Sequence, residues 1–267
     1  MPVTTVQACA RFIVAAFLFC HVPVASLLAA QPPEASRSET GAVVAKVIDG
    51  NTVVLDTGAT VRLAGIEVPR AAPDGTTTPL AEEARATLER ATIGKHVTLH
   101  YDGARPDRYG RMTAQLYAED GSWVQGLLLM AGLARVWTLP DQRIRIGDML
   151  ALEREARIKR RGLWSDAHYR IRIADDADRY ADSFQLVEGT VLSVSAVRGR
   201  TYLNFGPDWH TDFTIVIDPA DLKRFREVGI EPRAYEGRRL RVRGWIKSMN
   251  GPMIQATRPE QIEVLAE

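Results

Sequence analysis

Residues 43–70, VVAKVIDGNTVVLDTGATVRLAGIEVPR, decide the fold expected for the first part of this chain. Two apolar, β-branched runs flank the turn residues Asp49-Gly50-Asn51, and a second turn at residues 56–58 leads into a third run. This pattern predicts a meander of three strands. Because strand side chains alternate, Arg62 faces away from its apolar neighbours. An arginine on a rigid strand near Glu67 is placed to grip a phosphate beside a bound cation. The alternative is a solvated arginine on an ordinary meander.

The N-terminal segment predicts export. Arg11 precedes residues 12–30, which are apolar apart from one histidine and one serine and end in Leu-Ala-Ala. This order is typical of a secretory signal over residues 1–30, cut after Ala30, and predicts a periplasmic or secreted protein. The alternative is an uncleaved anchor, but Pro23 and His21 make a poor membrane span. We therefore expect no stable membrane span after cleavage.

Cysteine content and charge exclude several classes of protein. Cys9 and Cys20, the two cysteines, both lie in the predicted signal, so the mature chain would have neither a disulfide framework nor a thiolate metal site. The signal also contains one arginine and no acidic residue, so its removal leaves 33 basic and 33 acidic residues. A chain without net charge is unlike a tight, non-specific nucleic-acid binder. Any polyanion must be held by a local cluster.

The remaining sequence predicts two small domains. Residues 31–42 are polar and Pro/Ser-rich, typical of a flexible leader. In residues 43–165 the three-strand meander is followed by a helix and two strands, which is the order of an OB barrel. The predicted elements are a helix at 80–93, strands at 97–101 and 113–117, a short helix at 124–131, a strand at 134–136 and a long basic helix at 142–161.

Residues 166–183 are predicted to be a polar, charge-rich and partly helical linker, and residues 184–267 a second OB-like domain. The second domain repeats the order of three strands, helix and two strands. Its predicted strands are 190–194, 201–205, 213–217, 240–246, 253–257 and 262–264, with a helix from Pro219 to about Val228. The fold class expected is mainly β with helices (α+β), containing two five-stranded OB-type barrels.

Four motifs carry a resemblance to a known family. The combination of VIDGNT, VRLAGIEVP, DRYGR and RRGLW resembles the thermonuclease, or staphylococcal-nuclease-like, family over about residues 43–165. The resemblance implies a nuclease domain that cleaves phosphodiester bonds in DNA and RNA with Ca²⁺. The second domain resembles the C-terminal OB-like module of some bacterial relatives through YLNFG, DWHTDFT and RVRGW. That likeness brings no catalytic residue with it.

The resemblance assigns candidate roles to basic and aromatic residues. Arg62 and Arg111 fall on the two phosphate-binding arginines of the family, which implies catalytic roles for both. Tyr109 lies in the DRYGR motif and is a candidate substrate-binding residue. Arg70 falls where the family has the glutamate usually assigned as the general base. We therefore expect Arg70 to bind substrate and, with the other two arginines, to form an anion pocket without a metal.

The resemblance also implies a weakened calcium site. Asn51 stands where the family has a calcium-binding aspartate, Glu67 replaces the second calcium carboxylate, and Asp49 keeps an outer aspartate. Glu67 also carries a candidate catalytic role. Ca²⁺ affinity depends on the number of charged oxygen ligands, and a positioned general base contributes about 10²–10⁴ in rate. With Asn51 and Arg70 in place of carboxylates, we expect a slow enzyme or an inactive one.

Three functions follow from these residues. The first is an exported thermonuclease-like phosphodiesterase that hydrolyses nucleic acid with Ca²⁺ at a reduced rate. The second is an inactive, nuclease-derived protein that binds single-stranded DNA or RNA or another anion. The third is a protein-interaction module of the cell envelope. We expect a monomer, and no protein partner is identified. A purely structural alternative pairs Arg62 and Arg111 with Glu67 and Asp49 as loop braces.

Two further basic stretches have a functional and a structural interpretation. Arg239, Arg241 and Arg243 alternate with apolar residues on one predicted strand, and Tyr202 and Asn204 alternate similarly on another. Basic residues with exposed aromatics can hold a single strand, but a solvated strand face is the preferred interpretation. The basic residues of 154–161 are likewise interpreted as a solvated helix end, where cations complement the helix dipole.

Overall fold

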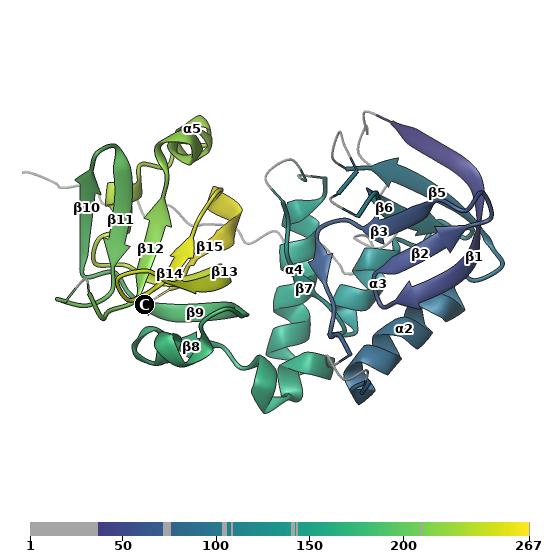
Figure 1. Cartoon of the computed structure of the whole chain (residues 1–267), viewed down its shortest axis with the longest axis horizontal. Coiled ribbons are helices and arrows are strands. Elements are labelled where there is room, and N and C mark those ends of the chain that lie inside the picture. Colours follow the sequence, from purple (N-terminus) through teal and green to yellow (C-terminus); the bar gives the residue numbers. More distant parts are fainter. Residues whose placement is uncertain are drawn as a thin grey trace, which may run out of the picture.

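The computed structural model shows two β-rich units side by side (Figure 1). It describes residues 37–71, 76–102, 106–107, 109–139, 142, 144–208 and 210–266. The predicted signal at residues 1–30 and the first part of the predicted leader lie outside the described residues. Among the described residues, no helix is both long and apolar enough to cross a membrane.

The first unit is a closed barrel with the strand order β1-β2-β3-β6-β5. The chain order of three strands, helix and two strands is therefore confirmed, and β3 and β6 pair in parallel to close the barrel. The apolar faces of these strands form one core, which includes Val53, Leu63, Leu99 and Leu116. The elements are β1 (Ser38–Asp49), β2 (Thr52–Leu55), β3 (Thr60–Leu63), β5 (His96–Tyr101), β6 (Met112–Ala118) and, between β3 and β5, the helix α2 (Pro79–Thr92).

The predicted leader is wrong at its C-terminal end. Strand β1 begins at Ser38, and residues 38–40 pair with residues 98–100 of β5. The Pro/Ser-rich composition indicated a flexible segment, but backbone pairing with β5 satisfies the main-chain groups of these residues whatever their side chains. The barrel therefore starts earlier than the predicted boundary at residue 43.

Local signals explain most helix boundaries. The hydroxyl of Thr78 accepts a hydrogen bond from the backbone N–H of Ala81, and Pro79 occupies the first turn of α2, as the Thr-Pro pair predicts. α3 (Val124–Met130) matches its prediction. α4 (Ile146–Ile158) is shorter than predicted because Arg145 has a φ of 59° and Arg160 a φ of 50°, which are incompatible with a right-handed helix.

The second unit is an eight-stranded sheet with the order β10-β11-β12-β14-β13-β9-β8, and β15 pairs with β13. Two pairs of neighbours in this sheet are parallel, β12 with β14 and β8 with β9. The hydrogen-bonded ladder is not closed, because β9 pairs with β13 while β10 pairs only with β11. The predicted second closed barrel is therefore not confirmed. The elements are β8 (Arg172–Ile173), β9 (Phe184–Thr190), β10 (Ser193–Val197), β11 (Arg200–Asn204), β12 (Thr214–Ile217), α5 (Pro219–Glu227), β13 (Arg239–Ser248), β14 (Pro252–Gln255) and β15 (Ile262–Val264).

Residues 166–183 are partly helical, as predicted, but they pack against the second unit instead of forming a separate linker. They contain short 3₁₀ turns at Ala167–Tyr169 and Ala174–Tyr180 as well as strand β8. Two small side chains, Ala174 and Ala177, are buried in the core of the second unit. The many charged residues point outward around these alanines, so composition alone suggested a solvated linker. The segment belongs to the second unit.

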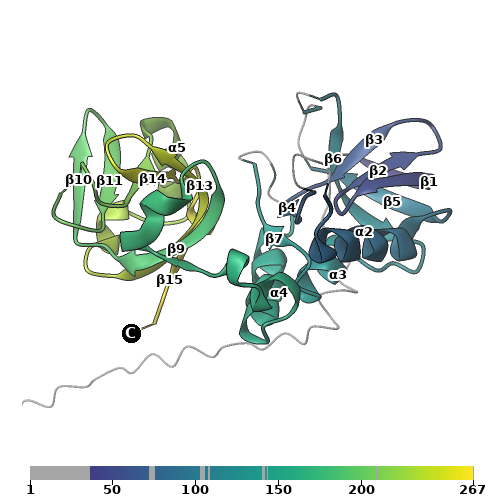
Figure 2. The ribbon, with the colours of Figure 1, turned by 60° about the horizontal axis from the view of Figure 1, so that its bottom comes forward.

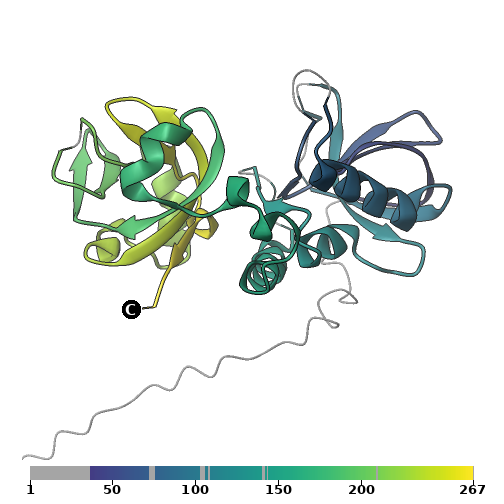
Figure 3. The ribbon, with the colours of Figure 1, turned by 90° about the horizontal axis from the view of Figure 1, so that it is seen from below.

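A buried ion-pair network joins the two units across α4, which lies between them in Figures 2 and 3. Arg243 of β13 pairs with Glu153 of α4 at 2.9 Å and with Glu263 of β15 at 2.6 Å. Arg157 of α4 reaches the same two carboxylates at 3.2 and 3.1 Å, and Arg241 reaches Glu263 at 2.9 Å. The Glu153 side chain is fully buried, and that of Arg243 is only 4% exposed.

This network corrects two interpretations of the sequence. Arg239 is exposed in its pair with Glu188, as a solvated strand face predicts. Arg241 and Arg243 are instead held in ion pairs with Glu188, Glu153 and Glu263, so these two arginines are not free to bind a single strand. Arg157 is also mostly buried at the interface, whereas Arg154 and Lys159 are exposed as expected for a helix end. The carboxylates that pair with these arginines come from distant parts of the chain, so the sequence pattern of β13 and α4 does not reveal them.

Acid is expected to weaken the junction through Glu263. Burial alone would raise the pKa of its carboxyl group, but the charges of three arginines lower that pKa to about 2; in order of effect they are Arg243, Arg157 and Arg241. A folded-state pKa below the ordinary value near 4.5 means that the stabilisation is complete above that value and is lost as the pH falls toward 2. The amount at stake is about 3 kcal/mol.

Acid unfolding followed by circular dichroism checks this prediction. The full chain should lose stability steeply between about pH 4.5 and 2, and Glu263→Gln should flatten that part of the profile. Glu227→Gln is the control, because its carboxylate is 53% exposed and pairs only loosely with Lys223 at 3.8 Å. Parallel acid profiles for the parent and Glu263→Gln would contradict the prediction.

Candidate functional site

The turn between β3 and β4 (Ile66–Glu67) positions the candidate site. Gly65 has a φ of +78°, a backbone conformation that favours glycine, and a Cβ there would also displace the end of the Met149 side chain of α4. The chain then leaves the barrel, and β4 pairs with β7 (Arg135–Val136). Arg62 therefore remains on the barrel wall while Glu67 lies beside the second unit.

Asn51 braces this turn. The side-chain amide of Asn51 donates a hydrogen bond of 3.2 Å to the backbone carbonyl oxygen of Ile66. The backbone carbonyl oxygen of Asn51 accepts a hydrogen bond of 2.8 Å from the backbone N–H of Leu63. Its side-chain oxygen accepts a 3.3 Å hydrogen bond from the hydroxyl of Thr52. Asn51 is buried, and Asp49 accepts a hydrogen bond from its backbone N–H at 2.9 Å. The polar groups of Asn51 thus hold the loops of the site together.

Arg62 stands at the centre of a cationic cluster. Burial lowers the pKa of its guanidinium most, and the charges of Arg70 and Arg111 lower it further, while Asp49 and Glu67 oppose this shift. Arg62 is half-buried on β3, and its guanidinium forms no hydrogen bond or ion pair with any residue that the structure describes. A partly desolvated cation next to other cations is stabilised by a nearby anion, so this arrangement favours anion binding.

Neighbouring residues fix the orientation of the Arg111 guanidinium. Asp107 accepts from its Nε at 2.8 Å and lies 2.7 Å from its Nη2. The same carboxylate accepts the backbone N–H of Tyr109 at 2.9 Å. The Tyr109 ring is 65% exposed and lies 5.0 Å from the Arg111 guanidinium carbon. Arg111 therefore braces its own loop, as the structural alternative predicted, but through Asp107 rather than Asp49. That alternative does not hold for Arg62, which has no ion pair with Glu67 or Asp49 among the described residues.

Glu67 lies close to two arginines but accepts no hydrogen bond from either, and its buried Oε2 has no hydrogen-bond partner among the described residues. Arg135 of β7 lies 3.6 Å from its Oε2, and Arg70 lies 3.9 Å from its Oε1. The Glu67 side chain is 11% exposed, whereas that of Arg70 is 62% exposed. Burial lowers the pKa of Arg135, and the Glu67 charge is the main opposing effect. Sequence reasoning missed Arg135, because its role depends on the pairing of β4 with β7.

The residues present do not fit a Ca²⁺ site. Calcium takes six to eight oxygen ligands, but Glu67 is paired with two arginines and the Asn51 side chain is hydrogen-bonded to its neighbours. No group of three or more His, Cys, Asp or Glu side chains in the described part of the chain is arranged to hold a metal. Three arginines, at 62, 70 and 135, also surround the Glu67 carboxylate. A cation placed there would meet more positive than negative charge.

Comparisons with known proteins agree with the barrel and its motifs. The sequence model described as staphylococcal nuclease homologue matches residues 60–166. An uncharacterized endonuclease of Escherichia coli O157:H7 is 35% identical over 127 residues, covering 46% of this chain and 76% of that protein. The chain belongs to the staphylococcal nuclease homologue family. Endonuclease YncB of Bacillus subtilis (strain 168) is 33% identical over 130 residues, covering 46% of this chain and 61% of that protein. The thermonuclease of Staphylococcus intermedius is 30% identical over 127 residues, covering 46% of this chain and 74% of that protein.

This membership confirms the resemblance for the first unit. The family match includes Arg62, Glu67, Arg70, Tyr109 and Arg111, but it ends at residue 166. The predicted C-terminal OB-like module is therefore not confirmed by the comparisons. The nuclease-family barrel brings together the two arginines implied by the resemblance, and it adds Arg70 beside them.

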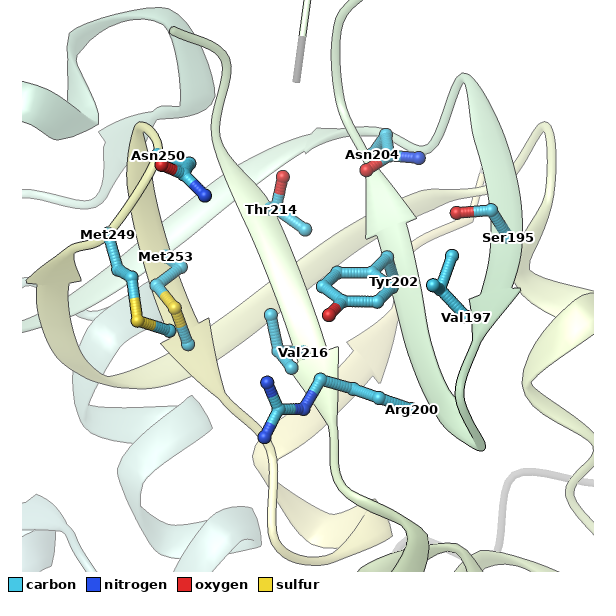
Figure 4. A pocket seen from close by; sticks show the side chains of 10 residues that line it. All are labelled: Ser195, Val197, Arg200, Tyr202, Asn204, Thr214, Val216, Met249, Asn250 and Met253. Atoms are coloured by element: carbon cyan, nitrogen blue, oxygen red, sulfur yellow. The ribbon is translucent and has the colours of Figure 1, made fainter. Parts of the chain in front are cut away.

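The second unit carries a separate cavity of about 580 Å³ on the face formed by β10, β11, β12 and β14. Figure 4 shows Tyr202 and Asn204 of β11 on this face, with Met249 and Met253 opposite. Arg200, the single charged residue among the described lining residues, lies 2.6 Å from Asp218. The described residues that line this cavity all belong to the second unit, and they include no cluster of cations like that around Arg62.

Proposed function

We propose that this member of the staphylococcal nuclease homologue family binds nucleic-acid phosphodiesters through Arg62, Arg70 and Arg111, and that Ca²⁺-dependent hydrolysis is strongly reduced. The observation that carries the proposal is the guanidinium of Arg62, which is half-buried between two further arginines and has no partner among the described residues. A phosphodiester oxygen would supply the missing counter-charge. Guanidiniums bind such oxygens in two-pronged, charge-assisted hydrogen bonds.

The relatives named endonucleases support a nucleic-acid ligand. Arg70 and Asn51, in contrast, support slow hydrolysis. Arg70 cannot accept a proton from an attacking water, because a guanidinium stays protonated. Losing a positioned general base costs about 10²–10⁴ in rate. Asn51 and the arginine-paired Glu67 weaken the metal set further. Binding without efficient cleavage is the outcome that these contacts favour.

We also propose that binding takes place outside the cytoplasm. This part of the proposal is supported by the sequence of residues 1–30, with its single positive charge, apolar core and terminal alanines. Single-stranded DNA and RNA are the ligand class, because the exposed Tyr109 ring beside Arg111 offers a stacking surface for an unpaired base. The protein is proposed to act as a monomer.

A cleavage and binding assay on the full chain tests the proposal. Labelled single-stranded DNA and RNA should bind equally well with Ca²⁺ and with a chelator, and Ca²⁺ should neither produce appreciable cleavage nor raise the melting temperature. The triple variant Asn51→Asp, Glu67→Asp, Arg70→Glu should gain a melting temperature that rises with Ca²⁺, since it provides two more carboxylates and removes one cation.

Two results would contradict the proposal. Chelator-sensitive cleavage by the unmodified chain, lost in Arg62→Ala, would show that Asp49, Asn51 and Glu67 make a working metal site. Failure of the unmodified chain to bind DNA or RNA of any length would remove the nucleic-acid ligand itself.

A further inference from the structure

A groove runs between the two units beside the candidate site. It has a volume of about 400 Å³ and is lined by Glu67 and Arg135 from the first unit and by residues of 168–185 and Trp245 from the second. Glu67 is also paired with Arg70, at 3.9 Å. One carboxylate is thus shared by the arginine cluster and the groove, so the groove starts where the cluster ends.

The groove exposes an aromatic side chain. Trp245 is 41% exposed, although its strand neighbours Gly244 and Ile246 are buried. Trp245 lies opposite Phe184 in the pairing of β13 with β9, and the Phe184 ring packs edge-on against Trp137 at 5.1 Å. A strand backbone holds this indole in place, so a base that stacks on it would cost little side-chain entropy.

Cations flank this ring. Arg172 stacks over Tyr180 at 4.0 Å and donates to Gln185 at 3.3 Å, which fixes its guanidinium. Arg179 pairs with Asp176 at 3.1 Å, but its side chain is 72% exposed. The groove is lined by three arginines, a histidine and two carboxylates: Arg135, Arg172, Arg179, His168, Glu67 and Asp182. Glu67 lies 3.6 Å from Arg135, so Arg172 and Arg179 are the groove arginines that do not face this carboxylate.

The walls of the groove are held in position before any ligand arrives. Arg135 donates to the carbonyl oxygen of Phe184 at 3.1 Å, and its guanidinium carbon lies 4.7 Å from the Phe184 ring. Arg258 of the second unit donates to the carbonyl oxygens of Thr138 and Leu139. Together with the buried pairs of Arg243, these contacts make the groove a fixed surface between the units.

We infer that this groove is a second subsite, in which a nucleic-acid single strand leaving the arginine cluster stacks a base on Trp245 and places a phosphate at Arg179. The inference rests on the proposed function, because the cluster anchors the strand. A single strand is the occupant, since a duplex hides the faces of its bases from an aromatic side chain. The strand crosses from one unit to the other, which gives the second unit a part in binding.

Oligonucleotide binding by the full chain, measured by fluorescence anisotropy over a series of roughly 2 to 12 nucleotides, tests the inference. For the unmodified chain, affinity should rise with length until the strand reaches the groove. Trp245→Ala should weaken the longer oligonucleotides by roughly 5–150-fold, the range expected for one stacked base, and should leave the shortest unchanged. Trp245→Phe, which keeps a ring, should restore most of the affinity.

Two further variants separate the subsite from its alternatives. Arg179→Gln should reduce the slope of log affinity against log salt by about 0.7, as expected for one lost phosphate contact to a single strand. Tyr202→Ala is the matched control, because this ring lies on the other cavity of the same unit. Its affinity should equal that of the unmodified chain at every length.

The outcomes distinguish failure of this subsite from failure of the proposed function. If the unmodified chain binds and Arg62→Ala does not, but Trp245→Ala binds all lengths normally, the groove is not a subsite. A loss in Tyr202→Ala instead would place the strand on the β10–β14 face. Equal losses for short and long oligonucleotides in Trp245→Ala, without rescue by phenylalanine, would mean a structural role. No binding by the unmodified chain would overturn both proposals.

Discussion

Arg62→Ala is expected to weaken binding of single-stranded DNA and RNA by about 100-fold or more. Hydrogen bonds to charged groups contribute about 1.5–3 kcal/mol each, and a guanidinium can make two to one phosphate. The guanidinium of Arg62 forms no hydrogen bond or ion pair with the residues described, so no existing contact has to be broken first. Arg62→Lys should bind with intermediate affinity, since lysine keeps the charge but loses the planar fork.

Removing the charge of Arg62 should not destabilise the fold. Burial and two neighbouring arginines lower the pKa of Arg62, which means that the folded protein disfavours the charged form relative to the unfolded chain. Arg62→Met, which keeps much of the side-chain volume, should therefore have an unfolding free energy at least equal to that of the parent. Loss of binding together with retained stability is typical of a residue that serves a ligand rather than the fold.

Urea denaturation and anisotropy on the same preparations check both halves of this prediction. The control is Arg90→Ala on α2, an exposed arginine whose guanidinium donates to the hydroxyl of Thr87 at 2.8 Å. It removes one positive charge from the same unit and should change binding little. Unchanged affinity in Arg62→Ala, or a loss of stability that matches the loss of binding, would contradict the role assigned to Arg62.

Arg243→Met is expected to lower the unfolding free energy by about 3–5 kcal/mol, the usual effect of removing one partner from a buried ion pair. The substitution would leave Glu153, whose side chain is fully buried, without its 2.9 Å partner, and Glu263 without its 2.6 Å partner. Arg157 still reaches both carboxylates, and Arg241 still reaches Glu263, but the fully buried Glu153 keeps only the more distant Arg157, at 3.2 Å. The two units should then separate at lower denaturant concentration.

The Arg243→Met substitution should also disturb the candidate site, which is connected to Glu153 through β7 and β4. One oxygen of Glu153 accepts the backbone N–H of Val136 at 2.6 Å, and Val136 pairs with Ile66 in the short sheet that carries Glu67. Arg239→Ala is the control on the same strand, because Arg239 is 58% exposed in its pair with Glu188; it should cost no more than about 1 kcal/mol. Equal stability of Arg243→Met and Arg239→Ala in chemical denaturation would show that the buried pairs do not hold the units together.

Local patterns account for the part of the molecule that could be predicted. The three-strand meander follows from β-branched alternation and the turns at residues 49–51 and 56–58, and α2 follows from Thr78 and Pro79. These signals act over a few residues, so they hold whatever the rest of the chain does. The same regularity placed Arg62 on one strand face and Arg111 after a turn, and the barrel brings them within electrostatic reach of each other.

Predictions based on composition failed where distant segments meet. The polar segments at 38–42 and 166–183 suggested a leader and a linker, yet one is a barrel strand and the other packs Ala174 and Ala177 into a core. The composition of such segments reflects mainly the polar residues that face solvent. It does not reveal a few small or backbone groups that another element covers.

Sequence alone therefore established the nuclease-like barrel, its family and the residues that could grip a phosphate, because spacing and alternation are local properties. Tertiary structure decided what each charge does. Arg62 and Arg243 both alternate with apolar residues on strands, but the first meets other arginines and the second meets Glu153 and Glu263. A charge acts through the partner that folding brings to it, and these partners come from other elements of the chain.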